Sequence, residues 1–147
     1  MWNKENAIKL IAIVILLLVV ASLIGCSNGV GRRTLSGDEV RRLFAGKTVQ
    51  GYHEKRNYAF ISYYEPDGTF RSYQGGSKTP RHGNWSVSDN GDICVYWQDT
   101  NENLCRKMVT DNRGNYWKVL FKKTRKGTKR ILIVTFKSFT EGNPNNL

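Results

Sequence analysis

The stretch YAFISYYEPDGTFRSY, residues 58–73, decides the fold class. Aromatic and β-branched residues dominate both of its ends, as is typical of β-strands. Between them lies Glu65-Pro66-Asp67-Gly68, where proline and glycine supply the backbone angles of a tight turn. The stretch therefore predicts two antiparallel strands, 58–64 and 69–73, joined by a short connection.

Short strands and tight turns continue on both sides of this hairpin. Asp89-Asn90-Gly91-Asp92 and residues 111–115 are rich in Asp, Asn and Gly, which accept turn conformations. Apolar and polar residues alternate around Trp85 and in 117–121, which indicates a sheet with one buried face. The predicted strands are 48–53, 58–64, 69–73, 83–87, 92–97, 104–109, 116–121 and 130–136.

One short helix precedes the strands. Ser36 is a good N-cap, and Glu39 three residues later completes a capping box. Gly46 is a natural stop signal. The apolar stripe of this helix consists of Val40, Leu43 and Phe44. A single stripe predicts that the helix packs against the strands that follow it.

The pattern predicts a mainly β domain at 35–139, with one N-terminal helix and a meander of about eight antiparallel strands. The strands would form a small lipocalin-like barrel or a strongly curved sheet, and the helix would cover an open end. Closing the barrel would also remove exposed strand edges. We expect a flexible tether at 26–34 and a disordered tail at 140–147, because both are rich in Gly, Asn and other polar residues.

The N-terminus indicates export. Two lysines precede an apolar run at 10–23, as in a signal peptide. The run closes with Leu23-Ile24-Gly25-Cys26, which resembles the lipobox of bacterial lipoproteins. The resemblance implies that the signal peptide, 1–25, is cut off and that Cys26 is acylated. The alternative is a single-pass inner-membrane anchor, although a spanning helix needs about 20 apolar residues.

The lipoprotein resemblance also implies a location. In that family, a serine after the acylated cysteine, here Ser27, permits export to the outer membrane of a Gram-negative cell. We therefore expect a lipid-anchored envelope protein at the outer membrane that faces the periplasm. Acyl chains on Cys26 would make the attachment almost permanent.

Two cysteines remain after Cys26, namely Cys94 and Cys105. Cysteines in exported domains usually pair. They lie at mirrored positions on two predicted strands that flank a polar turn at 98–103, so a symmetric hairpin would place them opposite each other. The sequence therefore predicts a structural disulfide. A free or reactive pair is the alternative.

The motif set of this domain is similar to that of small exported bacterial domains in a family of unknown function. The motifs are a Leu-Ser-Gly-x-Glu helix start at 35–39, Asp67-Gly68, Gly83-Asn84-Trp85 and Cys94-Val95-Tyr96-Trp97. The resemblance spans most of 35–120. It implies the fold and no catalytic role, and the likeness to lipocalin and avidin barrels is one of architecture alone.

Catalytic signatures are absent from the sequence. The only histidines, His53 and His82, are far apart and have no Glu or Cys at metal-ligand spacing. No nucleophile elbow, zinc-protease motif or phosphate-binding loop occurs. We therefore expect no enzyme, no metal and no cofactor.

Aromatic residues are frequent in the predicted strands: Trp85, Trp97 and Trp117 accompany Tyr58, Phe60, Tyr63, Tyr64, Phe70 and Tyr73. They could fill the core of a small barrel. Equally, they could line a concave ligand site with tyrosine hydroxyls as polar contacts. The sequence leaves both interpretations open, since both need inward-facing rings.

The chain is basic, with a formal net charge of +11, and its basic residues are concentrated in one segment. This segment contains Lys118, Lys122, Lys123, Arg125, Lys126, Lys129 and Arg130. It could be a solvated turn that resists edge-to-edge pairing. It could also bind a polyanion such as anionic lipid, lipopolysaccharide or a wall polymer. The expected location disfavours dedicated nucleic-acid binding.

These observations predict a non-catalytic envelope lipoprotein that binds an anionic envelope component or an envelope protein partner. The alternative is a carrier that holds a small apolar ligand in the barrel. A weaker alternative is an inhibitor of an acidic exported enzyme, because the charge of the chain is wrong for blocking a cationic one.

Overall fold

Nine strands and one helix follow one another in the part of the chain that the computed structural model describes, residues 31–147. They are β1 (Arg32–Thr34), α2 (Gly37–Phe44), β2 (Lys47–His53), β3 (Tyr58–Tyr64), β4 (Thr69–Gln74), β5 (Arg81–Val87), β6 (Asp92–Trp97), β7 (Glu102–Asp111), β8 (Tyr116–Thr124) and β9 (Gly127–Glu141). The segment for which the sequence predicts a signal peptide and a lipobox, including Cys26, lies outside the described residues.

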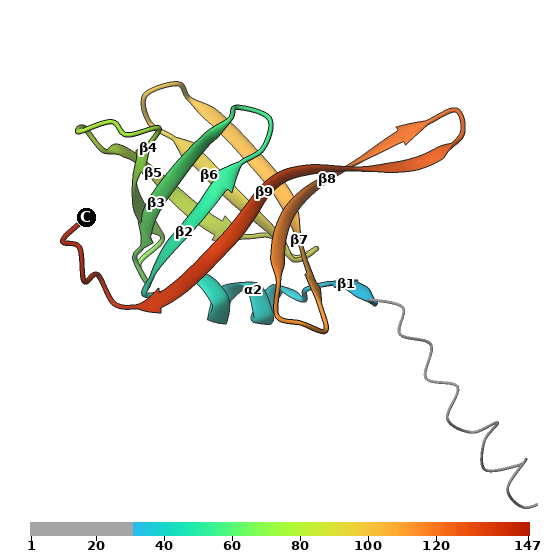
Figure 1. Cartoon of the computed structure of the whole chain (residues 1–147), viewed down its shortest axis with the longest axis horizontal. Coiled ribbons are helices and arrows are strands. Elements are labelled where there is room, and N and C mark those ends of the chain that lie inside the picture. The colour runs from blue at the N-terminus through green and yellow to red at the C-terminus, as the bar shows by residue number, and fades with distance from the viewer. Residues whose placement is uncertain (1–30) are drawn as a thin grey trace, which may run out of the picture. The chain divides into compact units, whose positions relative to one another are not determined.

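Strands β2 to β9 form a closed antiparallel barrel of eight strands (Figure 1). Each strand pairs with the next along the chain, and β9 returns to pair with β2. The predicted mainly β fold with one short helix and a small meander barrel is confirmed. All eight predicted strands are present. The structure adds β1, which pairs with the end of β7.

Helix α2 closes one end of the barrel (Figure 1). The predicted capping box is formed: the Ser36 hydroxyl accepts from the Glu39 N–H at 3.3 Å, and the Glu39 carboxylate accepts from the Ser36 N–H at 2.8 Å. Val40 and Phe44 are fully buried. The apolar stripe of the helix therefore forms the floor of the barrel.

The sequence motifs meet at this closed end. The Phe44 ring lies 4.8 Å from that of Tyr64, centroid to centroid. The indole N–H of Trp85 donates to the carbonyl of Glu65 at 2.8 Å, and the Trp85 backbone N–H donates to the carbonyl of Gly68 at 2.7 Å. The Gly-x-Trp motif thus ties β5 to the turn that carries the Asp-Gly motif.

Two segments differ from their prediction. Residues 32–34, expected in the tether, form β1, because β7 is longer than β6 and leaves a free edge at 109–111 that β1 fills. The expected disordered tail is also ordered in part: the Gly142 N–H donates to the carbonyl of Gly46 at 2.8 Å, and Leu147 is buried.

Cys94 and Cys105 lie directly opposite each other on β6 and β7, as the symmetric hairpin predicts. Their Sγ atoms are at disulfide distance, 1.99 Å.

Among residues 31–147, no helix combines the length and the hydropathy that crossing a bilayer would require.

Candidate ligand-binding cavity

A cavity of about 430 Å³ opens at the end of the barrel opposite α2. This volume is within the usual range of small-molecule sites, about 300–1,000 Å³. The period of two along each strand explains how it forms. On β3, every second residue from Tyr58 to Tyr64 points inward and lines the cavity.

Most of the cavity wall is apolar or aromatic. Its apolar residues are Phe60, Phe70, Val95, Leu104, Leu120, Ile133 and Val134, and Tyr58, Tyr64 and Trp97 add rings that carry a polar atom. Some of the aromatic residues whose role the sequence left open therefore face a cavity. Trp85 instead packs in the core, and Trp117 lies under the guanidinium of Arg32 at 4.6 Å from its ring centroid.

The charged residues of the wall are all basic. They are Lys55, Arg56, Arg106 and Lys118, with His53 beside them. No Asp or Glu is among the residues of the described chain that line this cavity. The site therefore carries a local excess of positive charge.

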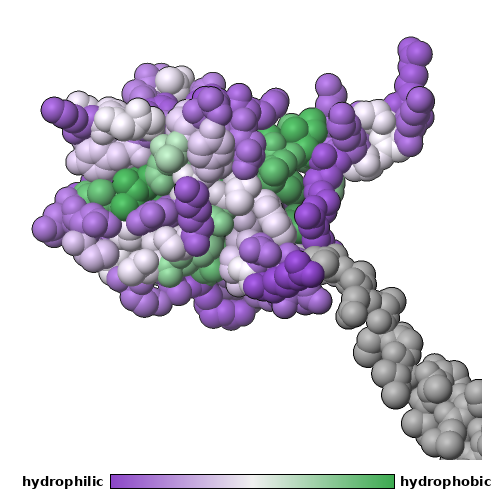
Figure 2. Space-filling view, in the orientation of Figure 1, coloured by the Kyte–Doolittle hydropathy of each residue, from purple (hydrophilic) through white to green (hydrophobic). Residues whose placement is uncertain are grey.

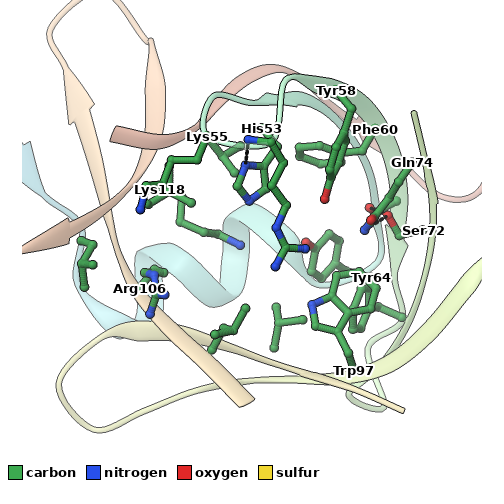
Figure 3. Close-up of a pocket in the computed structure, with 18 residues that line it drawn as sticks. His53, Lys55, Tyr58, Phe60, Tyr64, Ser72, Gln74, Trp97, Arg106 and Lys118 are labelled. Atoms are coloured by element: carbon green, nitrogen blue, oxygen red, sulfur yellow. Dashed lines mark hydrogen bonds between the residues drawn. The ribbon is translucent and has the colours of Figure 1, made fainter. Parts of the chain in front are cut away.

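Lys118 is the innermost of these groups. Its side chain reaches into the cavity from β8 (Figure 3), and its Nζ lies 5.9 Å from the centroid of the buried Phe136 ring. Burial, together with the nearby charge of Arg106, lowers the pKa of Lys118 to about 8. No ion pair joins Lys118 to a carboxylate of residues 31–147.

His53 experiences the same positive environment. Burial lowers its pKa, and the charges of Arg56, Lys118 and Lys55 add to the effect. Its Nδ1 accepts from the backbone N–H of Arg56 at 3.3 Å, which fixes the ring at the rim of the cavity (Figure 3). The basic residues around the opening thus disfavour the protonated form of His53.

Two other cations near the opening, Arg81 and Arg56, have carboxylate partners, whereas Lys118 and Arg106 have none among residues 31–147. Arg81 pairs with both carboxylate oxygens of Asp99 at 2.6 Å and stacks over the Trp97 ring at 4.0 Å. Arg56 lies 3.9 Å from a carboxylate oxygen of Glu102. Arg106 donates at 2.7 Å to the carbonyl of Cys105, which carries no full charge.

A polar wall faces the basic one. The hydroxyl of Ser62 donates to that of Ser72 at 2.7 Å, and the amide of Gln74 donates to Ser72 at 3.4 Å. Both serines are buried. Tyr64 lies two positions after Ser62 on the same face of β3, and burial raises the pKa of its hydroxyl. The wall thus offers neutral hydrogen-bonding groups within the apolar lining.

The basic segment of the sequence is divided between two places. Lys118 lines the cavity. The other six residues lie on the part of the β8–β9 hairpin that projects from the barrel, Arg125 and Lys126 at its turn: Lys122, Lys123, Arg125, Lys126, Lys129 and Arg130. His53 lines the cavity, whereas His82 is exposed on β5.

Sequence reasoning missed Lys55, Arg56 and Arg106 as parts of a site. A signal for Arg106 was present, because Leu104, Arg106 and Met108 share one face of a predicted strand. An arginine between two inward apolar residues points into the barrel. Lys55 and Arg56 lie in a turn, where no periodicity indicates direction.

Within residues 31–147, no three His, Cys, Asp or Glu side chains come together as a metal site would require. Comparison of the chain with protein-family models, curated proteins and solved structures finds no match.

Proposed function

We propose that the barrel binds a small amphipathic anion, with its apolar body in the cavity and its acidic head against Lys118 and Arg106. The observation that carries the proposal is the combination of an apolar cavity with cations that no lining carboxylate neutralises. This deepens the carrier alternative of the sequence analysis, which considered an apolar ligand without a charged head.

The energetics favour such a ligand over a wholly apolar one. Apolar surface removed from water contributes roughly 25 cal/mol per Å². Lys118 is already partly desolvated in the free protein, in line with its half-buried position and its lowered pKa. An anionic head would therefore gain a charge-assisted hydrogen bond, worth roughly 1.5–3 kcal/mol, at little further cost in dehydration of the ammonium group.

A series of ligands with one tail and different heads tests the proposal. Dodecanoate and dodecyltrimethylammonium, below their micellar concentrations, and 1-dodecanol, below its solubility limit, would be titrated into the purified barrel. The barrel, residues 31–147, is a compact unit with its own core. Calorimetry would report binding, as would tryptophan fluorescence, because Trp97 lines the cavity. We expect dodecanoate to bind roughly 10- to 100-fold more tightly than dodecanol, and the cation to bind least.

Equal affinity for the three heads would contradict an anion site and support a wholly apolar carrier. No binding of any of them, together with no ligand retained in native mass spectra of protein purified without denaturation, would remove the carrier function altogether.

We further propose that the protein is a lipid-anchored envelope protein, as the lipobox resemblance implies. The supporting observation is the sequence Leu23-Ile24-Gly25-Cys26 behind an apolar run. Cys26→Ser should stop lipid attachment and leave unprocessed precursor. Labelling with radioactive palmitate, with Cys94→Ser as a matched control that keeps the lipobox, checks this. Normal processing and labelling of the Cys26→Ser protein would refute the lipid anchor.

A further inference from the structure

The β8–β9 hairpin extends beyond the barrel as an arm, residues 120–131 (Figure 1). Pairing of β8 with β7 stops at Val119, and pairing of β9 with β2 stops at Val134. The strands of the arm therefore pair only with each other. All ten residues from 121 to 130 are exposed, and six of them are basic while none is acidic.

The departure of β8 leaves a gap in the barrel wall. Residues 102–106 of β7 pair with β6 on one side, and no strand of the described chain pairs with their other edge. Leu104 and Arg106 line the cavity on one side of the gap, and Lys118 and Leu120 line it on the other. The cavity is thus bounded here by side chains alone.

Apolar side chains are exposed where the arm leaves the barrel. Phe121 on β8 is 44% exposed and Leu132 on β9 is 41% exposed. Figure 2 shows a hydrophobic patch at the base of the arm, next to hydrophilic residues along it. Exposed aromatic and aliphatic residues beside a basic cluster are the combination found on protein surfaces that lie at a lipid interface.

The N-terminal connection lies on the same flank. β1 pairs with β7 (Figure 1), and Arg32 stacks on Trp117 of β8. Gly31 follows Cys26 by five positions in the sequence, and an extended chain spans at most about 3.6 Å per residue. A lipid on Cys26 would therefore hold Gly31 within roughly 20 Å of the bilayer.

We propose that this flank, formed by β1, the β7–β8 gap and the arm, docks on an anionic lipid bilayer. Charge complementarity favours this partner, since six basic residues face no acidic one within the arm. The exposed Phe121 and Leu132 favour a bilayer over a soluble polyanion, which offers no apolar phase. Docking turns the gap toward the membrane. The gap would then be a path for the ligand between the bilayer and the cavity, and this step rests on the proposed function.

Vesicle sedimentation tests the docking. The barrel, residues 31–147, would be mixed with vesicles of phosphatidylcholine alone or of phosphatidylcholine with phosphatidylglycerol. Each basic residue near an anionic surface contributes roughly fivefold to partitioning. We expect binding only to the anionic vesicles, and a loss of tenfold or more in the variant Lys122→Gln/Lys123→Gln/Lys126→Gln. Salt should weaken binding because these residues are exposed.

A matched control separates a local effect from the net charge. Arg42, Lys78 and Lys137 are also exposed but lie off the arm, so Arg42→Gln/Lys78→Gln/Lys137→Gln changes the total charge equally. This variant should retain binding. Equal losses in both variants would overturn the arm as the docking element. Phe121→Ser/Leu132→Ser should weaken the vesicle binding that remains at high salt. If that binding were unchanged, the two residues would make no apolar contact with the bilayer, and the argument for a bilayer over a soluble polyanion would fail.

Two further outcomes separate this proposal from the ligand site. Lys118→Met should dock normally, and the arm variant should bind dodecanoate in solution normally, because the two sites use different residues. If the wild-type barrel instead bound a soluble polyanion such as polyphosphate and not anionic vesicles, that result would overturn the bilayer as the partner and point to an anionic polymer.

Discussion

The Nζ of Lys118 lies 5.9 Å from the centroid of the Phe136 ring, inside the barrel and without a carboxylate partner in the described chain. A desolvated cation disfavours folding, and the ring face returns only part of that cost. An apolar residue of similar length would stabilise the empty barrel. The presence of lysine at this position therefore favours a role in binding rather than in folding.

Lys118→Met should stabilise the ligand-free barrel and abolish its preference for anions. One pKa unit corresponds to about 1.4 kcal/mol, and solvent in the cavity screens part of it, so we expect a gain on the order of 2 kcal/mol at pH 7. Denaturant unfolding gives the stability, and dodecanoate titration gives the affinity. Lys137→Met, at an exposed site on β9, is the control and should change neither.

The stability gain should itself depend on pH. Lysine in an unfolded chain has a pKa of about 10.4, whereas that of Lys118 in the barrel is about 8. Between these values the unfolded chain binds more protons, so the wild-type stability rises with pH through this group. The advantage of Lys118→Met should be full below pH 8 and shrink toward pH 10.4. An advantage that is constant over this range would show that Lys118 is not desolvated.

Binding of an anion should weaken as the pH rises through about 8. Loss of the Lys118 proton removes the charge that faces the ligand, and the other basic residues that line the cavity are Arg106, Lys55 and Arg56. Dodecyl sulfonate keeps its charge at every pH used, so any pH dependence of its affinity comes from groups of the protein. We expect a roughly 10-fold or greater fall between pH 7 and 9.5. Lys118→Met should show no such fall, and a matching fall in that variant would assign the titration to another group.

The sequence predicted the barrel well because its strands and turns are encoded locally. Turn residues at 65–68 and 89–92 fix where strands end, and alternation fixes which face is buried. The helix was predicted for the same reason, since the capping box of Ser36 and Glu39 needs only local contacts. β1 was missed because it depends on the free edge of β7, a property of the assembled sheet.

The cavity could not be predicted from the same signals. Inward aromatic residues look alike in sequence whether they meet at the barrel centre or leave space. The small residues Ser62 and Ser72, which pair inside the barrel, make that space, but a serine on a strand equally indicates an exposed face. The sequence grouped Lys118 with the other basic residues of its segment. The direction of the Lys118 side chain could not be predicted, because it depends on where β8 leaves β7.

The pairing of Cys94 with Cys105 should stabilise the barrel. The cysteines are 11 residues apart in sequence, and a bridge that closes so short a loop contributes roughly 2–3 kcal/mol. The double variant Cys94→Ser/Cys105→Ser should lose this amount in denaturant unfolding. Reductant should destabilise the wild type to the same extent and leave the double variant unaffected. Thiol labelling of both cysteines in the unreduced, denatured protein would show that they do not pair.

Gly83→Ala should disturb both the fold and the cavity, because β5 has no room for a methyl group at this position. A Cβ there would meet the backbone carbonyl of Tyr96 on the neighbouring strand and the ring of Phe70, which lines the cavity. The carbonyl is fixed by the sheet, so the strain must be relieved by a shift of the strand and of the ring. We expect a loss of about 1–3 kcal/mol in the free energy of unfolding and weaker binding of dodecanoate. Asn84→Ala, at the next and exposed position of β5, is the control. If Gly83→Ala were as stable as Asn84→Ala, close packing against Phe70 would not explain the glycine of the Gly-x-Trp motif.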